Sequence, residues 1–476
     1  MGAPNPPLPA RGTAVSTLPA FTTLVTEIDT GDTAWLLVSS ALVLLMAPGL
    51  ALFYGGMVRS KSVLNMMMMT FGALAVILVL WTLVGYSLAF GDDIGGGVLG
   101  NPLQYAGLGQ LLSPEADVVG TVPAILFAVF QGLFCVITGA LVSGAIADRA
   151  RFGAWLVFIG AWTVLVYAPV AHWVFDFSAG DHVGGWLANQ VGVIDFAGGT
   201  AVEICSGASG LALALVLGKR IGFGRDPMRP HNLTLVMLGA GLLWFGWFGF
   251  NAGSELAADG TAALVWVNTT AATAAAMLGW LVVERLRDGH ATSVGAASGI
   301  VAGLVAITPA CGALSPVGSL ILGAVAGGLC ALAVGLKYRF GYDDSLDVVG
   351  VHLVAGLWGT VGAGLLSTTT GLFYGGGLTQ TILQIVIALV TVVLSGIVTL
   401  GLGLLLKATM GWRIDKDAET SGIDQDVHAE SAYDLTVGGG GRFAGALAGA
   451  ISGAFAEAGV TTPPTTSPSI SEGASA

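Results

Sequence analysis

The chain alternates between long apolar segments and short polar ones over most of its length. A run of roughly 20 apolar residues crosses about 30 Å of hydrocarbon as an α-helix. The short alternating segments typical of a membrane β-barrel are not visible. The pattern predicts an all-α polytopic membrane protein with eleven transmembrane helices, over residues 33–57, 64–90, 120–147, 152–175, 195–218, 231–254, 260–283, 292–308, 313–336, 347–368 and 379–406.

Lysine and arginine residues mark one side of the predicted membrane domain. All 17 except Arg11 and Arg442 fall in segments that are separated from one another by two predicted spans. Because basic loops stay in the cytoplasm, we expect the N-terminus outside the cell and the C-terminus inside, with the protein in the cell membrane. The basic segments are residues 59–61, 149–151, 219–229, 285–287, 337–339 and 407–416.

Composition limits the partners. Charged residues make up 10% of the chain, against about 25% in soluble domains, so membrane lipid must surround most of it. The formal net charge of −12 argues against nucleic acid. Acidic loops are compatible with a cationic substrate, although acids that merely avoid the cytoplasmic loops give the same excess. The four cysteines show no pairing or metal spacing, and we expect no metal and no cofactor.

The chain divides into one membrane domain and its flanking segments. We expect an extracellular segment over 1–32, the eleven-helix domain over 33–408, an ordered cytoplasmic segment over 409–435 and a low-complexity, disordered tail over 436–476. The chain has 73 glycines, and those within the spans predict close helix contacts, because small residues let helices in lipid approach one another.

Two predicted spans open alike and indicate an internal repeat. Span five begins Asp195-Phe-Ala-Gly and carries Glu203, and span ten begins Asp347-Val-Val-Gly and carries His352. Because the two are five spans apart, their helices run in opposite directions. This favours an inverted five-helix repeat with a site near the middle of the membrane.

Glu203 and His352 are ionisable residues inside predicted spans. A charged side chain at the centre of a membrane helix costs roughly 2.5–3.5 kcal/mol, so such residues usually face a cavity or pair with one another. We interpret Glu203 and His352 as lining one pore and exchanging protons. The alternative is a polar contact that only holds two helices together.

Polar and aromatic residues gather near the outer side. Asp195 is placed to cap the start of span five and also to attract a cation. Phe250 and Ser254 are four residues apart and share a helical face, where a ring beside a hydroxyl suits a small cation with N–H donors. Trp244 and Trp247 fit an interfacial aromatic belt.

The other histidines and nucleophiles show no catalytic pattern. His172, His182, His231 and His290 lie near span ends or in loops, and we interpret them as structural or solvated. No nucleophile stands beside a base, so the protein is not expected to be an enzyme.

Taken together, these segments resemble the ammonium transporter family (Amt/Mep/Rh) from about Thr33 to Leu435. Several dispersed motifs in the right order carry the resemblance. They run from Phe53 to Lys61, Gln131 to Phe134, Asp195 to Thr200, Gly249 to Ser254, Asp343 to His352 and Glu419 to Tyr433.

The resemblance implies roles for single residues. Phe134 and Phe250 match the paired rings that close the outer mouth, and Ser254 matches the hydroxyl of the outer cation site. Asp195 matches the buried acid beneath that site, which adds an electrostatic role to capping. Trp247 matches a pore-lining tryptophan, which replaces the interpretation as a belt residue.

The chain departs from the family pattern at two places. Members usually carry two facing pore histidines, whereas here the first position is Glu203 and only the second, His352, is a histidine. Some members, certain fungal ones among them, carry an acid there. The position of the outer-site tryptophan is Phe175, followed by an extra stretch, 176–181, so either Phe175 or Trp186 completes the outer site.

The family implies a homotrimer with one pore per subunit, ammonium and ammonia as substrates with methylammonium as a further candidate, and a PII-type regulatory protein at the cytoplasmic segment 411–435. We expect an ammonium transporter that captures and deprotonates ammonium, conducts ammonia and relays the proton through Glu203 and His352. The alternatives are an ammonium sensor that signals through its C-terminal tail and an electroneutral ammonia gas channel.

Overall fold

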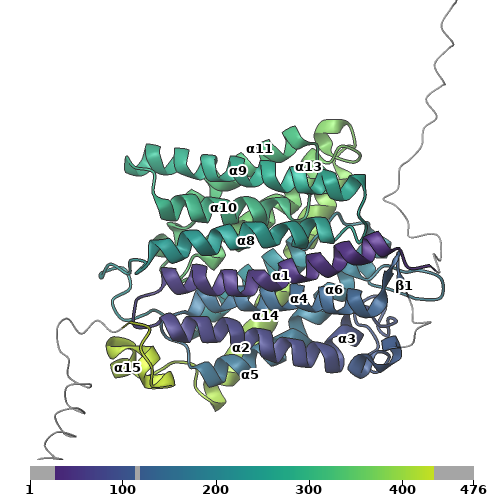
Figure 1. Ribbon diagram of the computed structural model, residues 1–476. Coiled ribbons are helices and arrows are strands. Elements are labelled where there is room, and N and C mark those ends of the chain that lie inside the picture. Colours follow the sequence, from purple (N-terminus) through teal and green to yellow (C-terminus); the bar gives the residue numbers. More distant parts are fainter. Residues whose placement is uncertain (1–26, 113–117, 434–476) are drawn as a thin grey trace, which may run out of the picture. The chain divides into compact units, whose positions relative to one another are not determined.

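Helices make up most of the computed structural model (Figure 1), which describes residues 27–112 and 118–433. Strands β1 (Val118–Val119) and β2 (Val122–Pro123) form a small antiparallel pair. The α-helices are α1 (Thr30–Met57), α2 (Val63–Leu80), α3 (Tyr86–Phe90), α4 (Ala124–Ser143), α5 (Phe152–Trp162), α6 (Ala168–Phe175), α7 (Cys205–Leu217), α8 (Leu233–Gly253), α9 (Gly260–Asp288), α10 (Ser293–Ile307), α11 (Pro316–Ala333), α12 (Leu336–Phe340), α13 (Val354–Leu366), α14 (Thr379–Thr409) and α15 (Lys416–Ser421).

Short helical turns extend or join several of these helices. The π-helical turns are η1 (Trp81–Gly85), η4 (Thr163–Tyr167), η5 (Leu187–Val191), η6 (Gly199–Ile204), η7 (Val349–Leu353) and η9 (Asp424–His428), and the 3-10 turns are η2 (Ala106–Leu112), η3 (Gly144–Ile146) and η8 (Leu372–Tyr374). The helices belong to one compact unit, which ends at Ala432. The predicted tail over 436–476 and most of the predicted N-terminal segment lie outside the described residues.

Ten helices within the described ranges are long and apolar enough to cross a membrane. They match predicted spans one to seven and nine to eleven to within a few residues. The eighth predicted span corresponds to α10, a shorter apolar helix of 15 residues. Four of these spans contain a π-helical turn: η1 joins α2 to α3, η4 joins α5 to α6, and η6 and η7 form the first turns of the spans that continue as α7 and α13. The hydropathy pattern gives no sign of these turns.

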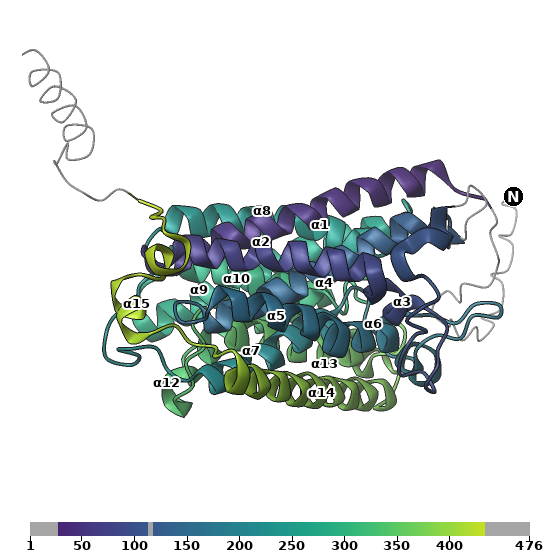
Figure 2. The same cartoon turned by 90° about the horizontal axis from the view of Figure 1, so that it is seen from below.

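Glycines allow the closest helix contacts. Helices α9 and α11 pack along each other. A Cβ atom on Gly327 would lie 1.9 Å from the carbonyl oxygen of Ala276, and one on Gly323 would lie 2.1 Å from that of Ala272. Any larger residue at either position would push the two backbones apart, as expected for helices that associate through small residues. Helix α14 lies along one side of the unit, against α7 and α13 (Figure 2).

One end of the helical unit, which we call the basic end, holds a buried network of ion pairs. The Arg220 guanidinium lies 2.8 Å from the Asp343 carboxylate and 3.1 Å from that of Asp148. Asp148 also lies 3.2 Å from Arg59. All three of Arg220, Asp343 and Asp148 are buried. Several of the basic residues that indicated membrane orientation therefore also join loops from different parts of the chain.

The segment from Gly411 to Glu430 packs against the basic end. The Ile414 N–H donates to the Arg149 carbonyl over 3.1 Å. The Asp424 carboxylate accepts from the backbone N–H groups of Leu64 and Asn65, at 3.0 and 2.8 Å, at the start of α2. Helix α15 lies at this end in Figure 1. The C-terminal segment is thus tied to the helices by backbone as well as side-chain contacts.

Candidate functional site

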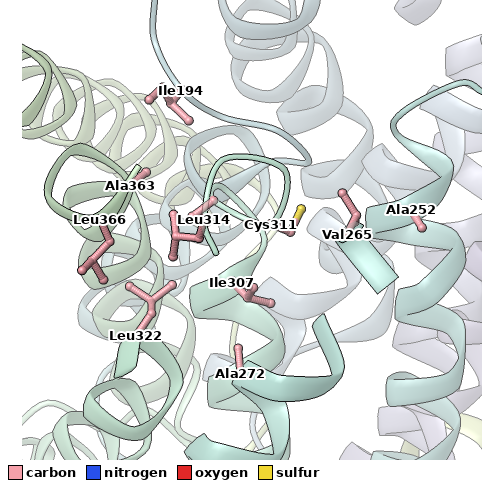
Figure 3. Close-up of a cluster of buried hydrophobic side chains, with 11 residues drawn as sticks. Ile194, Ala252, Val265, Ala272, Ile307, Cys311, Leu314, Leu322, Ala363 and Leu366 are labelled. Atoms are coloured by element: carbon pink, nitrogen blue, oxygen red, sulfur yellow. The ribbon is translucent and has the colours of Figure 1, made fainter. Parts of the chain in front are cut away.

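The site begins with the loop before η6, which is held from two sides. Ile194 donates its N–H to the Gln384 side-chain oxygen over 3.0 Å, and its carbonyl accepts from the Gln384 amide over 2.7 Å. Its side chain belongs to a buried apolar cluster that also includes Cys311 and Leu314, from the connection between α10 and α11 (Figure 3). This packing fixes the backbone of the next residue, Asp195.

Asp195 caps the first turn of η6. Its carboxylate accepts from the backbone N–H groups of Gly198, Gly199 and Thr200, at 2.8, 2.6 and 2.8 Å, and from the Thr200 hydroxyl. Both oxygens are used. All four donors come from residues 198–200, at the start of η6. The structure therefore shows the capping contacts that the sequence predicted for Asp195.

Glu203 and His352 are in direct contact. The Glu203 Oε2 atom lies 2.7 Å from His352 Nδ1, and both side chains are buried. Among the residues that the structure describes, no donor reaches the other oxygen, Oε1, which is also buried. A buried polar atom without a partner is rare in proteins and points to a bound molecule or to a functional group.

Each member of this pair lies in a π-helical turn, Glu203 in η6 and His352 in η7. π-Helical turns inside longer helices often mark functional sites. A glycine follows each of the two residues by four positions: Gly207 after Glu203 and Gly356 after His352. A Cβ atom on Gly207 would lie 2.5 Å from the Leu353 nitrogen, and one on Gly356 would lie 2.9 Å from the Glu203 Cβ. The two glycines let the helices approach closely enough for the carboxylate to reach the imidazole.

The structure corrects the sequence match between spans five and ten. Asp347, matched to Asp195 from the sequence, has a left-handed backbone with φ of 63° and pairs with Lys337 at 2.6 Å. It is Asp344 that accepts from the N–H groups at the start of span ten, those of residues 348 and 349, at 3.1 and 2.7 Å. Asp195 precedes Glu203 by eight residues and Asp344 precedes His352 by eight. The similarity of sequence therefore matched Asp195 to Asp347, three residues after the aspartate that makes the equivalent contacts.

Two phenylalanine rings stack face to face. The Phe134 ring, on α4, and the Phe250 ring, on α8, have centroids 4.0 Å apart and an interplanar angle of 17°. Trp247 lies 5.2 Å from Phe250, and its indole N–H donates to the Thr308 hydroxyl over 2.9 Å. All three rings are buried, and Trp247 is not at an exposed aromatic belt.

Ser254 lies at the end of α8. Its hydroxyl donates to the Phe250 carbonyl over 2.8 Å and the side chain is half-buried. Because the hydroxyl proton is used within the helix, the lone pairs of Oγ remain available to accept a hydrogen bond from a cation.

Of the two aromatic residues considered for the outer site, Phe175 lies beside the loop of Asp195. Its ring is 3.5 Å from the position of a Cβ atom on Gly198. The Trp186 ring instead packs edge to face on Trp173, with centroids 5.9 Å apart. Its backbone N–H donates to the Gly97 carbonyl over 3.1 Å. The geometry favours Phe175.

Comparisons with known proteins show the family of the chain. Residues 34–433 match the model of the Ammonium Transporter Family. The chain belongs to the ammonium transporter family. It is 58% identical over 440 residues to the ammonium transporter of Mycobacterium tuberculosis, a match that covers 87% of this chain and 92% of the relative. Together with the ten apolar helices, this makes it a multi-pass protein of the cell membrane.

Solved structures of this family are similar to the chain. Mep2 of Saccharomyces cerevisiae matches with a TM-score of 0.75 at 35% identity, over 87% of this chain and 94% of that one. A sensor Amt protein matches with a TM-score of 0.77 at 26% identity, over 83% of this chain and 97% of that one. The resemblance drawn from the sequence motifs is therefore confirmed.

Three residues that hold the site in place were not identified from the sequence of this ammonium transporter family member. Thr308 orients Trp247, Gln384 holds the loop before Asp195, and Asp344 caps span ten. Asp344 could have been identified from its position eight residues before His352, which equals the spacing between Asp195 and Glu203. Nothing in the sequence marks Thr308 or Gln384, because their partners lie more than 60 and nearly 200 residues away.

Proposed function

We propose that this protein transports ammonium by separating the cation into ammonia and a proton. Moving an isolated ion into an apolar interior costs tens of kcal/mol, whereas neutral ammonia avoids most of that cost. The observation that supports this most is the 2.7 Å contact between Glu203 and His352, with the second Glu203 oxygen buried and without a hydrogen-bond partner among the described residues. A carboxylate–imidazole pair of this length can pass a proton in either direction.

Capture takes place at the outer site. The Ser254 hydroxyl accepts a hydrogen bond from the cation, and the Phe134 and Phe175 rings attract it by cation–π contact. Asp195 contributes a fixed negative charge rather than a proton-accepting oxygen, because both of its oxygens are already hydrogen-bonded. Ammonia then passes the rings of Phe134 and Phe250, while the proton crosses by Glu203 and His352, so transport carries current. Methylammonium is a further candidate substrate.

The same proposal includes the topology. Helix α10 completes eleven spans, with the N-terminus outside the cell and the basic end in the cytoplasm. The capping aspartates at 195 and 344, each eight residues before an ionisable side chain, support an inverted five-helix repeat. We further propose the domain limits 33–408 and 409–435, a homotrimer with one pore in each subunit, and a PII-type protein as partner of residues 411–435.

Currents in reconstituted vesicles test the relay. If Glu203→Ala and His352→Ala together left the ammonium-evoked current unchanged, the relay would be wrong. Preserved ammonia flux without any current in the wild-type protein would instead favour an electroneutral gas channel.

Two substitutions of Asp195 separate its capping contacts from its charge. Asn keeps one of the two acceptor oxygens for the first turn of η6 and removes the charge, whereas Ala removes both oxygens and the charge. We expect Asp195→Asn to lose most of the ammonium current but less stability than Asp195→Ala. Asp195→Ala should lose the current and also about 0.5–2 kcal/mol of stability, the range for a lost helix cap. Full current in Asp195→Asn would show that capping alone is its role.

A sensor that signals through its C-terminal segment is the second candidate, favoured by the contacts that tie residues 411–430 to the start of α2. Deleting residues 436–476 leaves those contacts in place. We expect the shortened protein to take up labelled methylammonium at the wild-type rate. Loss of uptake at an unchanged amount of protein in the membrane would favour the sensor.

A further inference from the structure

An alternating chain of carboxylates and imidazoles lies beside the loop that follows α6. The Asp92 carboxylate is 2.6 Å from His182 Nδ1, and His182 Nε2 is 2.9 Å from Asp176. The other Asp176 oxygen is 3.1 Å from His172 Nδ1, and His172 Nε2 is 3.3 Å from Asp93. We call these five residues the Asp–His chain. None of them is needed for the transport steps proposed above.

The Asp–His chain joins two loops. Asp92 and Asp93 follow α3, whereas Asp176 to His182 follow α6. The Asp93 N–H donates to the Val183 carbonyl over 2.8 Å, which adds a backbone contact between the loops. The second loop includes residues 176–181, the stretch interpreted as extra in the sequence analysis. His182 directly follows this stretch and contacts Asp92 of the first loop.

Asp176 connects the Asp–His chain to the proposed outer site, because it directly follows Phe175 in the sequence. Its backbone carbonyl accepts from the Gly185 N–H and the Asn189 side chain, both over 2.9 Å. Its carboxylate lies between the two histidines. The residue after the Phe175 ring is thus held by both its backbone and its side chain.

We propose that Asp176 and His182 are positioning residues for ammonium binding: they hold Phe175 against the loop of Asp195 at the outer site. This inference rests on the proposed function, in which Phe175 contacts the cation. A carboxylate at each nitrogen of His182 fits the imidazolium form, which has an N–H donor on both sides. Loss of that proton removes one of the two donors.

The pH range of this effect follows from the surroundings of His182. The hydrogen bond that His182 donates to the Asp176 carboxylate raises the pKa of His182. Burial opposes this, and the charges of Asp176 and Asp92 add to the rise, giving a pKa of about 9. The other members of the Asp–His chain are Asp93 and His172. Asp181, the residue before His182, is exposed. Because the folded pKa is above the ordinary value of about 6.5, the contact is complete below pH about 6.5 and is lost as pH rises through about 9.

The test measures the ammonium concentration that gives half of the maximal current, for wild type and variants side by side at pH 7 and pH 10. The ratio between variant and wild type cancels the change in substrate protonation, since both experience the same solution. We expect His182→Gln to raise this concentration about tenfold at pH 7, the loss of roughly one charge-assisted hydrogen bond, with the maximal current retained. At pH 10 the ratio should approach one.

Arginine at the same position serves as the rescue. It keeps a positive charge and several donors at both pH values. His182→Arg should therefore bind like wild type at pH 7 and better than wild type at pH 10. Asp92→Asn is a second variant. The Asp92 side chain is 52% exposed, so the position should tolerate substitution. Its ratio to wild type should also be raised at pH 7 and approach one at pH 10. His290→Gln, exposed beyond α9 at the basic end, is the control and should give a ratio of one throughout.

A His182→Gln ratio that stayed constant between pH 7 and pH 10, or a fall in the maximal current alone, would overturn the positioning role. These results differ from failure of the proposed function, in which the wild type itself would carry no ammonium current.

Discussion

Replacing Glu203 by glutamine should lower the ammonium-evoked current by about 100-fold or more, the scale of a positioned acid–base group. Glutamine keeps the shape of the side chain and an oxygen near His352 Nδ1, but it cannot take up and release a proton at neutral pH. Solid-supported membrane currents from vesicles with matched protein content measure the loss. A variant with wild-type current would place the proton path elsewhere.

Two further variants make this result specific. Glu203→His places a second imidazole opposite His352, as most family members have, and should keep a current whose dependence on pH differs from that of wild type. Glu284→Gln is the matched control, because Glu284 is also a buried glutamate, with its carboxylate 2.9 Å from the Thr292 N–H near the basic end. Its current should remain unchanged.

Replacing Arg220 by alanine should destabilise the protein by about 3–5 kcal/mol, because it removes the main partner of the buried Asp343 carboxylate and one of the two arginine partners of Asp148. Burial acts to raise the pKa of Asp343, but the hydrogen bond and charge of Arg220 outweigh it and lower that pKa. The stability that comes from Asp343 is therefore present above pH about 4 and is lost as the pH falls through the lowered pKa. Unfolding by a denaturing detergent, followed at pH 7 and at pH 3, should show a smaller difference from wild type at pH 3.

The neighbouring Arg225 provides the comparison for this effect. It lies in the same loop, five residues away, but is exposed. Arg225→Ala should change the free energy of unfolding by no more than about 0.5 kcal/mol. If Arg220→Ala and Arg225→Ala changed the free energy of unfolding by the same amount, the ion pairs of Arg220 would stabilise the protein no more than a surface charge does.

Much of the fold could be predicted because the bilayer imposes a length and a composition on each span. The apolar segments and the spacing of the basic loops located the helices, and the glycines at 323 and 327 indicated their closest contacts. The π-helical turns that carry Glu203 and His352 could not be predicted, since they depend on packing against the opposite helix. Asp347 does not cap span ten as Asp195 caps span five, and the capping residue Asp344 was missed because no local motif marks it.

The candidate site was predicted unevenly. The pairing of Glu203 with His352 followed from ionisable residue types that are rare in apolar surroundings, whereas the pairing of Phe134 with Phe250 followed only from the resemblance to the family. The sequence left Phe175 and Trp186 open, because the choice depends on which ring packs on Trp173. The role inferred for His182 depends on carboxylates from two loops that are about 80 residues apart, and a single histidine in a loop gives no sign of them.

The stacking of Phe134 on Phe250 has a kinetic consequence. With ring centroids 4.0 Å apart and nearly parallel planes, nothing passes between the two rings until at least one side chain rotates. On the proposed route, each ammonia molecule that crosses requires a rotamer change among closely packed side chains. The frequency with which the two rings separate would then set an upper limit on the transport rate, whatever the concentration of substrate at the mouth.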